Sequence, residues 1–220
     1  MKRVGIIRAY LHLIGYFLQL FFYLLYGIIK LSRLKQAPVT ILGGSRLPQD
    51  SSYREQAQLI AQKLTLEEIP VLVGGSSSYL EKWCHQLHKH TIESVMAINV
   101  KSTVEQDISC IHNDMVLTHF SARKWILISY SSGFIVFPGG FGTLSELTQL
   151  ITLIQTEKRG KAPIVLIGVA YWQPLLEWLR EYTLTEKLIK AEHLELFSVT
   201  DSLEQAVEII KQNYHKEFAI

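Results

Sequence analysis

The sequence predicts an α/β protein with a doubly wound parallel sheet, preceded by a hydrophobic N-terminal helix. Short apolar runs alternate with amphipathic segments after Pro38, which is typical of parallel strands buried between two layers of helices. Glycine-rich turns follow three of these runs. Residues 9–29, by contrast, contain no Asp, Glu, Lys or Arg, and we expect them to form a separate helix.

Length and composition limit the number of domains and the kinds of partner that we expect. A chain of 220 residues is large enough for one well-buried core and small for two. We therefore expect a hydrophobic helix and linker over residues 1–37 and one α/β domain over residues 38–220. The 22 basic and 20 acidic side chains nearly balance, which argues against nucleic acid as a partner. Cys84 and Cys110 form no Cys-x-x-Cys pair, so neither a disulfide framework nor a zinc site is expected.

The apolar segment at residues 9–29 would be about 30 Å long as a helix, close to the hydrocarbon thickness of a bilayer. Basic residues flank it on both sides and no cleavage site follows it, which favours an uncleaved membrane anchor over a signal peptide. Its more polar residues recur every three or four positions and so lie on one stripe of the helix. This pattern fits a spanning helix that pairs through its stripe, an in-plane helix with the stripe toward water, or a core helix of a soluble domain. The stripe comprises Arg8, His12, Tyr16, Gln19, Tyr23, Tyr26, Lys30 and Arg33.

In the rest of the chain, strands are expected over residues 39–42, 70–73, 94–100, 133–137, 164–167 and 196–199. Helices are expected over residues 52–64, after residue 77, and from residue 201 to about residue 214. Each begins with a capping-box pattern, namely Ser52 with Glu55, Ser78 with Glu81, and Asp201 with Glu204. Ligands of such sheets bind beyond the carboxyl ends of the strands. No Gly-x-Gly-x-x-Gly or Gly-Lys-Ser/Thr motif follows a strand, which argues against a dinucleotide or P-loop site.

The turn after residue 137 is the strongest candidate for a ligand site. It reads Pro138-Gly139-Gly140-Phe141-Gly142-Thr143, and its glycines let the backbone approach an anion closely and adopt positive φ. The helix that follows offers free N–H groups and a positive dipole end to a phosphate, and the hydroxyl of Thr143 adds a contact. Glu146 lies one turn later, where a carboxylate faces the sugar attached to that phosphate. An alternative is that Thr143 and Glu146 form only a capping box.

This segment, together with Arg123-Lys124 before it, resembles the PGGxGTxxE motif and preceding Arg-Lys of the LONELY GUY family, also labelled lysine decarboxylase-like. The similarity runs from about Val39 to the final helix and includes TLIQT at residues 152–156 and the Tyr171-Trp172 pair. The resemblance implies a Rossmann-like nucleotide-binding domain, a homodimer, and hydrolysis of the N-glycosidic bond of an AMP-like or cytokinin-type nucleoside 5′-monophosphate. It implies no cofactor.

By the same resemblance, Arg123 and Glu146 are the catalytic residues and the loop at residues 138–143 binds phosphate, with Lys124 as a secondary contact. A carboxylate such as Glu146 can stabilise an oxocarbenium-like ribose and orient water, whereas an arginine holds phosphate or a hydroxyl. No metal is required. His85, His88 and His90 lie on a segment otherwise rich in Lys and Gln, and we interpret them as an exposed helix face.

The two earlier glycine turns complete the predicted binding site with Gly43, Gly44, Ser45, Gly75 and Ser76. Both depart from the family pattern. The first reads Gly-Gly-Ser-Arg where many relatives have Gly-Ser-x-Arg, and the second replaces two glycines by serines. The presence of both Arg123 and Glu146 favours one hypothesis, a membrane-associated enzyme with its catalytic domain in the cytoplasm. The serines of the second turn slightly favour the other, a protein held at the membrane that binds a nucleotide or nucleotide-like cofactor without cleaving it.

Overall fold

The computed structural model describes residues 2–34, 36–48, 50–74, 94–100 and 115–214. Within them the chain forms a seven-stranded sheet, ordered β4-β3-β2-β1-β5-β6-β7, in which every pair of neighbours is parallel. The predicted α/β fold with a doubly wound parallel sheet is confirmed. The strands are β1 (Val39–Leu42), β2 (Val71–Gly74), β3 (Val95–Val100), β4 (Met115–Leu117), β5 (Gly133–Val136), β6 (Ile164–Ile167) and β7 (Ser198–Thr200).

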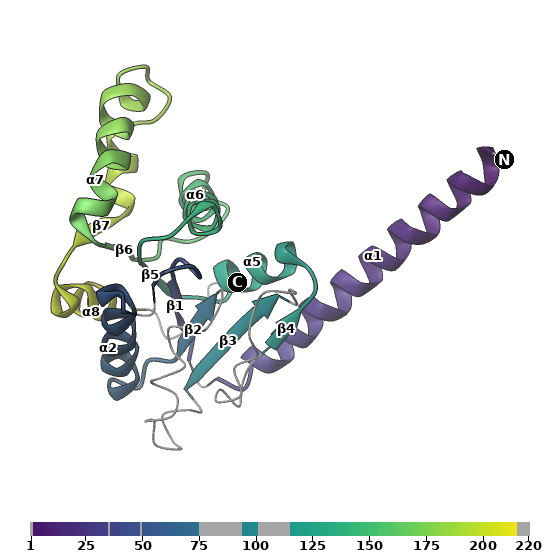
Figure 1. The fold of residues 1–220 in the computed structure, drawn as a ribbon, viewed down its shortest axis with the longest axis horizontal. Helices are drawn as coiled ribbons and strands as arrows, with labels where there is room; N and C mark the ends of the chain where they lie inside the picture. Colours follow the sequence, from purple (N-terminus) through teal and green to yellow (C-terminus); the bar gives the residue numbers. More distant parts are fainter. Residues whose placement is uncertain (1, 35, 49, 75–93, 101–114, 215–220) are drawn as a thin grey trace.

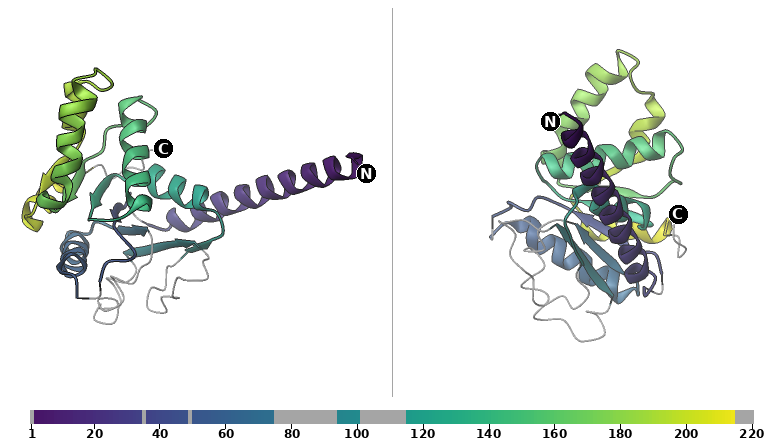
Figure 2. Two further views of the ribbon diagram at one scale, coloured as in Figure 1. Left: turned by 45° about the horizontal axis from the view of Figure 1, so that its top comes forward. Right: turned by 90° about the vertical axis from the view of Figure 1, so that its right-hand side faces the viewer.

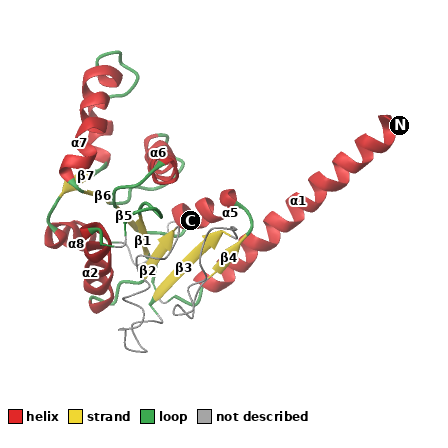
Figure 3. Ribbon diagram, in the orientation of Figure 1, coloured by secondary structure: helices red, strands yellow, loops and turns green. Residues whose placement is uncertain are grey.

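Helices cover both faces of this sheet (Figure 1; Figure 3). α2 (Ser52–Leu66) and α8 (Leu203–Gln212) pack on one face. On the other face lie α5 (Phe120–Ser129), α6 (Phe141–Gln155), α7 (Val169–Trp178) and the end of α1 (Lys2–Leu31). A π-helical segment (Leu179–Leu184) continues α7, and a short 3-10 helix (Ala191–Leu196) precedes β7.

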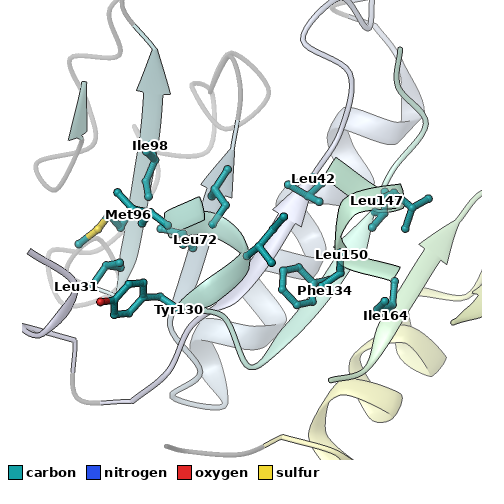
Figure 4. Packing of buried hydrophobic residues seen from close by; sticks show 14 of the residues in the cluster. Leu31, Leu42, Leu72, Met96, Ile98, Tyr130, Phe134, Leu147, Leu150 and Ile164 are labelled. Atoms are coloured by element: carbon teal, nitrogen blue, oxygen red, sulfur yellow. The ribbon is translucent and has the colours of Figure 1, made fainter. Parts of the chain in front are cut away.

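Alternation along the strands divides the core into two clusters. In β1, for example, Val39 and Ile41 face α2 and α8, whereas Leu42 packs toward α5 and α6. Figure 4 shows the second cluster, in which Leu42, Phe134 and Leu150 are fully or almost fully buried. Each face thus has its own hydrophobic layer, which is why the strand sequences read as continuous apolar runs.

The six predicted strands all form, with ends that differ from the sequence prediction by at most two residues. β4 was not predicted. It has only three residues at the sheet edge, and Val116 between its two buried side chains is exposed, so it lacks the apolar run that marks the other strands.

The predicted capping boxes are wrong where the structure describes them. α2 begins after Ser51, which makes no side-chain capping bond. α8 begins after Ser202, whose hydroxyl accepts from the backbone N–H of Gln205 at 3.2 Å. Asp201 instead accepts from the N–H of Val169 at 2.8 Å, at the start of α7. The box predicted at Ser78 and Glu81 lies outside the described residues.

The order of the strands places a switch point between β1 and β5. The chain leaves β1 for β2, β3 and β4 on one side, and then returns to β5 on the other side of β1. Loops that leave adjacent strands in opposite directions create a crevice at their carboxyl ends. In this region the N–H of Gly44 donates to the carbonyl of Pro138 at 3.0 Å. This bond joins the loop after β1 to the loop after β5.

α1 projects from the domain edge beside β4 (Figure 2). Among the described residues it alone is long and apolar enough to cross a membrane, over Tyr10–Leu31, and only 6% of that apolar window is buried. With so little of this window buried, α1 is not enclosed in the core of the domain, although its second half packs against the domain. Its length and composition permit a membrane helix.

Candidate active site

A cavity of about 560 Å³ lies at the switch point, beyond the carboxyl ends of β1 and β5. Its walls come from the loops that follow β1 and β5 and from the first turns of α5 and α6. The lining residues are Gly43, Gly44, Ser45, Arg46, Leu47, Pro48, Gly74, Phe120, Arg123, Pro138, Gly139, Gly140, Phe141, Gly142, Thr143, Glu146 and Tyr171.

Glycine is required at two places in this cavity because two loops touch through their backbones. A Cβ added at Gly139 would lie 2.1 Å from Thr143 Oγ1 and 2.9 Å from the backbone nitrogen of Gly44. A Cβ added at Gly44 would lie 3.0 Å from the Cα of Gly139. The glycines predicted a close approach of the backbone to an anion. In the structure they allow the two loops to approach one another, and both loops therefore line one cavity.

The start of α6 supplies the donors that an anion needs. The helix begins at Phe141 with Gly140 as its N-cap, and no side chain caps it. The first N–H groups of a helix have no intrahelical acceptor, so those at residues 141–143 can serve a ligand. Added Cβ atoms at Gly140 and Gly142 would meet nothing within 4 Å, which leaves space in front of these donors.

The positive φ angles predicted for this loop are not found. Gly140 has a φ of −92°, and among the described glycines only Gly168, the N-cap of α7, has a positive φ. An extended N-cap followed directly by helical residues aims the N–H groups at the cavity without a left-handed turn. The N-terminal dipole of α6 therefore provides the predicted positive field by ordinary helix geometry.

Arg123 and Glu146 form a buried ion pair, with Arg123 Nη2 2.6 Å from Glu146 Oε1. Their side chains are 7% and 5% exposed, and both line the cavity. The Arg123 guanidinium also lies over the Phe120 ring, 5.2 Å from its centroid. Its Nε is buried and has no hydrogen-bond acceptor among the described residues.

This pair contradicts the alternative that Glu146 only caps a helix. Because α6 begins at Phe141, Thr143 and Glu146 both lie inside the helix. The carboxylate of Glu146 therefore faces Arg123 of α5 rather than a free backbone N–H. Charge-assisted hydrogen bonds of this length are strong, and the bond holds the carboxylate at one wall of the cavity.

The structure brings together most of the predicted site residues. Gly43, Gly44 and Ser45 line the same cavity as Arg123, Glu146 and the whole loop at residues 138–143. Lys124 does not line it, because its ammonium group donates to Ser145 Oγ at 2.9 Å on the outer side of α6. Gly75 and Ser76 lie outside the described residues, as do His85, His88 and His90.

Two aromatic residues of the cavity were not included in the predicted site. Phe120 opens α5 three positions before Arg123 and is 60% exposed. Tyr171, from the first turn of α7, donates its hydroxyl to the carbonyl of Gly139. The Tyr171-Trp172 pair was noticed in the sequence, but its contact with a loop more than 30 residues earlier depends on the packing of α7.

A larger cavity, of about 840 Å³, lies at the amino ends of β6 and β7. None of the predicted site residues lines it. Open parallel sheets bind ligands at the carboxyl ends of their strands, so the smaller cavity, with its buried charge pair and free helix N-terminus, is the candidate active site.

Comparison with known proteins identifies the family of the chain. Residues 81–210 match the family described as "Possible lysine decarboxylase". The chain is 26% identical over 152 residues to cytokinin riboside 5′-monophosphate phosphoribohydrolase LOG4 of Arabidopsis thaliana, covering 68% of this chain and 70% of that protein. It is 28% identical over 148 residues to the probable phosphoribohydrolase LOG6 of the same plant, covering 66% and 72%.

Solved structures show the same fold. The molybdenum cofactor carrier protein of Chlamydomonas reinhardtii superposes with a TM-score of 0.53 at 15% identity, over 80% of this chain and 97% of that one. The molybdenum cofactor binding protein of Rippkaea orientalis gives 0.52 at 19%, over 81% and 98%. These likenesses concern the fold alone. The family match spans more than half of the chain, and the chain therefore belongs to the "Possible lysine decarboxylase" family, which is the LONELY GUY family predicted from its phosphate-loop motif.

Proposed function

We propose that this protein is a phosphoribohydrolase that cleaves the N-glycosidic bond of a nucleoside 5′-monophosphate, AMP-like or cytokinin-type, to give free base and ribose 5-phosphate. The observation that carries the proposal is the buried Arg123–Glu146 pair, which lies in one cavity with the free N-terminus of α6. The names of its relatives in Arabidopsis support the same reaction class.

The loop and helix determine how such a substrate would bind. The phosphate occupies the space in front of Gly140 and Gly142, where the N–H groups of residues 141–143 and the helix dipole favour a dianion. Glu146 lies five residues after Phe141, so it is more than one turn deeper along α6. A ribose attached to the bound phosphate is thus directed toward this carboxylate.

Glu146 then acts on the sugar. Departure of the base leaves positive charge on the ribose ring, and a nearby carboxylate stabilises that charge and orients the attacking water. Arg123 has a permanently charged guanidinium and does not act as a base. Its Nη2 fixes Glu146 and its buried Nε, which has no acceptor among the described residues, is available to a ribose hydroxyl. The reaction requires no metal or cofactor.

We assign the reaction to the cytoplasm and expect a homodimer, as the family resemblance implies. Light scattering of the purified full-length chain in mild detergent measures the oligomeric state. A mass of two chains is expected, and a monodisperse single chain contradicts this part of the proposal.

The reaction is tested by incubating the full-length protein with AMP, GMP, CMP and isopentenyl-AMP and separating the products by chromatography. Free base and ribose 5-phosphate are expected from at least one substrate. Glu146→Gln, which keeps the volume of the side chain, lowers the rate by about 100-fold or more because it removes the charge that stabilises the transition state. Glu208→Gln, an exposed change on α8, is the matched control and leaves the rate unchanged.

One result would contradict hydrolysis, and another would contradict the role of Glu146. Binding of AMP without release of base would assign the cavity to the alternative, a nucleotide-binding protein. A Glu146→Gln variant that melts at the wild-type temperature and keeps full activity would remove Glu146 from the mechanism.

A further inference from the structure

The second half of α1 is part of the folded domain. Leu31 is fully buried, and Leu20, Tyr23 and Leu24 pack against the cluster that contains α5 and α6. At Gly27 the helix approaches α5 so closely that an added Cβ would lie 2.4 Å from Ile126 Cδ1. The glycine thus marks a close contact between α1 and α5.

The polar stripe of α1 also faces the domain. Gln19 Nε2 donates to Thr118 Oγ1 at 3.1 Å, and Gln19 Oε1 lies 3.2 Å from His119 Nε2. The Tyr16 ring packs edge-on against the His119 ring, with 4.6 Å between centroids. Thr118 and His119 form the turn that leads into α5. This part of the stripe therefore has partners within the protein, and it is not open to pair with another membrane helix.

This docking is incompatible with a helix that crosses the bilayer over Tyr10–Leu31. Such a crossing would carry the Thr118–His119 turn and the first turns of α5 into the hydrocarbon, where polar groups are costly. Residues 2–15, which precede this contact, cover about 21 Å at 1.5 Å per residue. A bilayer core is about 30 Å thick, so these residues alone do not span it.

Large apolar side chains are nevertheless exposed along α1 between Tyr10 and Ile29. Soluble monomers seldom expose contiguous apolar surface of this extent, and such a surface marks an interaction site. We call it the α1 apolar face. It consists of Leu11, Leu13, Ile14, Phe17, Leu18, Phe21, Phe22, Leu25, Ile28 and Ile29.

The charge of the chain indicates what covers this face. Six of the 22 basic residues and none of the 20 acidic residues lie in residues 1–38, so residues 39–220 carry 16 basic against 20 acidic side chains. Arg8 and Arg33, toward the two ends of the apolar face, are exposed. Anionic lipid headgroups attract a basic amphipathic helix of this kind. A second α1 would bring the same positive charges and repel it.

We propose that α1 lies in the plane of an anionic lipid surface, with the α1 apolar face in the headgroup and acyl boundary and the Tyr16–Gln19–Tyr23 side docked on the turn before α5. The helix does not cross the bilayer. Because α5 carries Arg123, the docking also holds the active-site helix at a fixed height above the lipid.

The surface preference is tested with the full-length protein and vesicles of phosphatidylcholine with one quarter phosphatidylglycerol, compared with vesicles of phosphatidylcholine alone. Co-sedimentation is expected to be at least about tenfold tighter with the anionic vesicles and to weaken with salt. Leu18→Asp lowers binding by at least about tenfold. Leu66→Asp, which places the same charge at an exposed leucine of α2, leaves it unchanged.

The orientation is tested by depth measurements on spin labels at Leu11, Leu18 and Leu25, each introduced as a single cysteine with Cys84 and Cys110 replaced by serine. These positions are seven residues apart and lie nearly on one face. An in-plane helix gives the same shallow depth at all three labels. A crossing helix gives the greatest depth at Leu18 and shallower values at the other two, which would overturn the proposal.

Two further outcomes would also overturn it. One is no binding to either kind of vesicle. The other is a lipid-free dimer in light scattering that Leu18→Asp dissociates, which would assign the α1 apolar face to a second copy of the chain. All of these measurements are independent of hydrolytic activity, so they stand whether or not the proposed reaction is found.

Discussion

At the scale of single residues, the site depends on one ion pair and one backbone contact. Arg123 and Glu146 are both buried and hold each other at 2.6 Å. Removing one partner of such a pair leaves the other charge uncompensated, which costs about 3–5 kcal/mol. Both Glu146→Gln and Arg123→Ala remove one charge of the pair, but Glu146→Gln keeps the side-chain volume and an oxygen that can accept from Arg123 Nη2. It is therefore the better probe of chemistry, whereas Arg123→Ala also removes the packing of the guanidinium.

The contact between Gly139 and Gly44 gives a prediction at this scale. Gly139→Ala places a Cβ 2.1 Å from Thr143 Oγ1 and 2.9 Å from a backbone nitrogen, and the overpacking destabilises the protein by about 1–3 kcal/mol. Gly142→Ala is the control, because its Cβ meets nothing within 4 Å and alanine favours the helix by about 0.5–1 kcal/mol. Thermal unfolding measures both. Equal melting temperatures for the two variants would show that the loops do not touch as described.

Among the secondary-structure elements, α7 supports the loop at residues 138–143 from outside the strands that carry it. Gly168 begins α7 with a left-handed φ of 103°, and the Tyr171 hydroxyl one turn later donates to the Gly139 carbonyl. Asp201, after β7, fixes the same helix start through the N–H of Val169. The position of the loop therefore depends on α7 and on the residue that follows β7, both of which are distant from it in sequence.

Loss of the Tyr171 hydroxyl should loosen the loop without unfolding the protein. A hydrogen bond of this kind contributes about 1 kcal/mol, so Tyr171→Phe raises the KM for the nucleotide by about fivefold, with a smaller change in kcat. Steady-state kinetics separates the two constants. Tyr182→Phe, which also removes an exposed tyrosine hydroxyl, serves as the control, and an equal KM for both variants would refute a role of α7 in binding.

At the scale of the whole molecule, the end of α8 returns to the beginning of the sheet. The Tyr214 hydroxyl donates to the Ala37 carbonyl at 2.6 Å, just before β1. Burial raises the pKa of Tyr214 to about 12, from an ordinary value of 10.0. The contact links the C-terminal helix to the segment that joins α1 to the domain.

This raised pKa predicts a loss of stability in alkali. Below pH 10 the phenol is protonated in the folded and unfolded chains alike and its contribution is fully present. Between pH 10 and 12 the unfolded chain releases the proton first, so stability falls as pH rises. Because the side chain is only half buried, the loss is about 1 kcal/mol. Urea unfolding at pH 8 and pH 11 should show a smaller decrease for Tyr214→Phe than for the wild type, and equal decreases would contradict the assignment.

Particular elements show how much of this was predictable. The four-residue strands β1 and β6 were predicted with their observed ends, because buried parallel strands leave an unbroken apolar run in the sequence. β4 was not predicted, since a short edge strand with an exposed centre leaves no such run. The capping boxes failed because Ser, Asp and Glu near a helix start satisfy several competing partners, and only the packed chain selects among them.

The family, the parallel α/β fold, the loop at residues 138–143 and the apolar character of α1 could all be predicted from residue order, because each depends on local sequence. Tertiary structure set the remaining contacts. It paired Glu146 with Arg123 instead of a backbone N–H, placed Tyr171 on the loop and turned Lys124 away from the cavity. It also docked the Tyr16 and Gln19 part of the polar stripe of α1 on the domain. Such contacts join segments far apart in the chain, and their partners are set by the order of the strands and the packing of the helices.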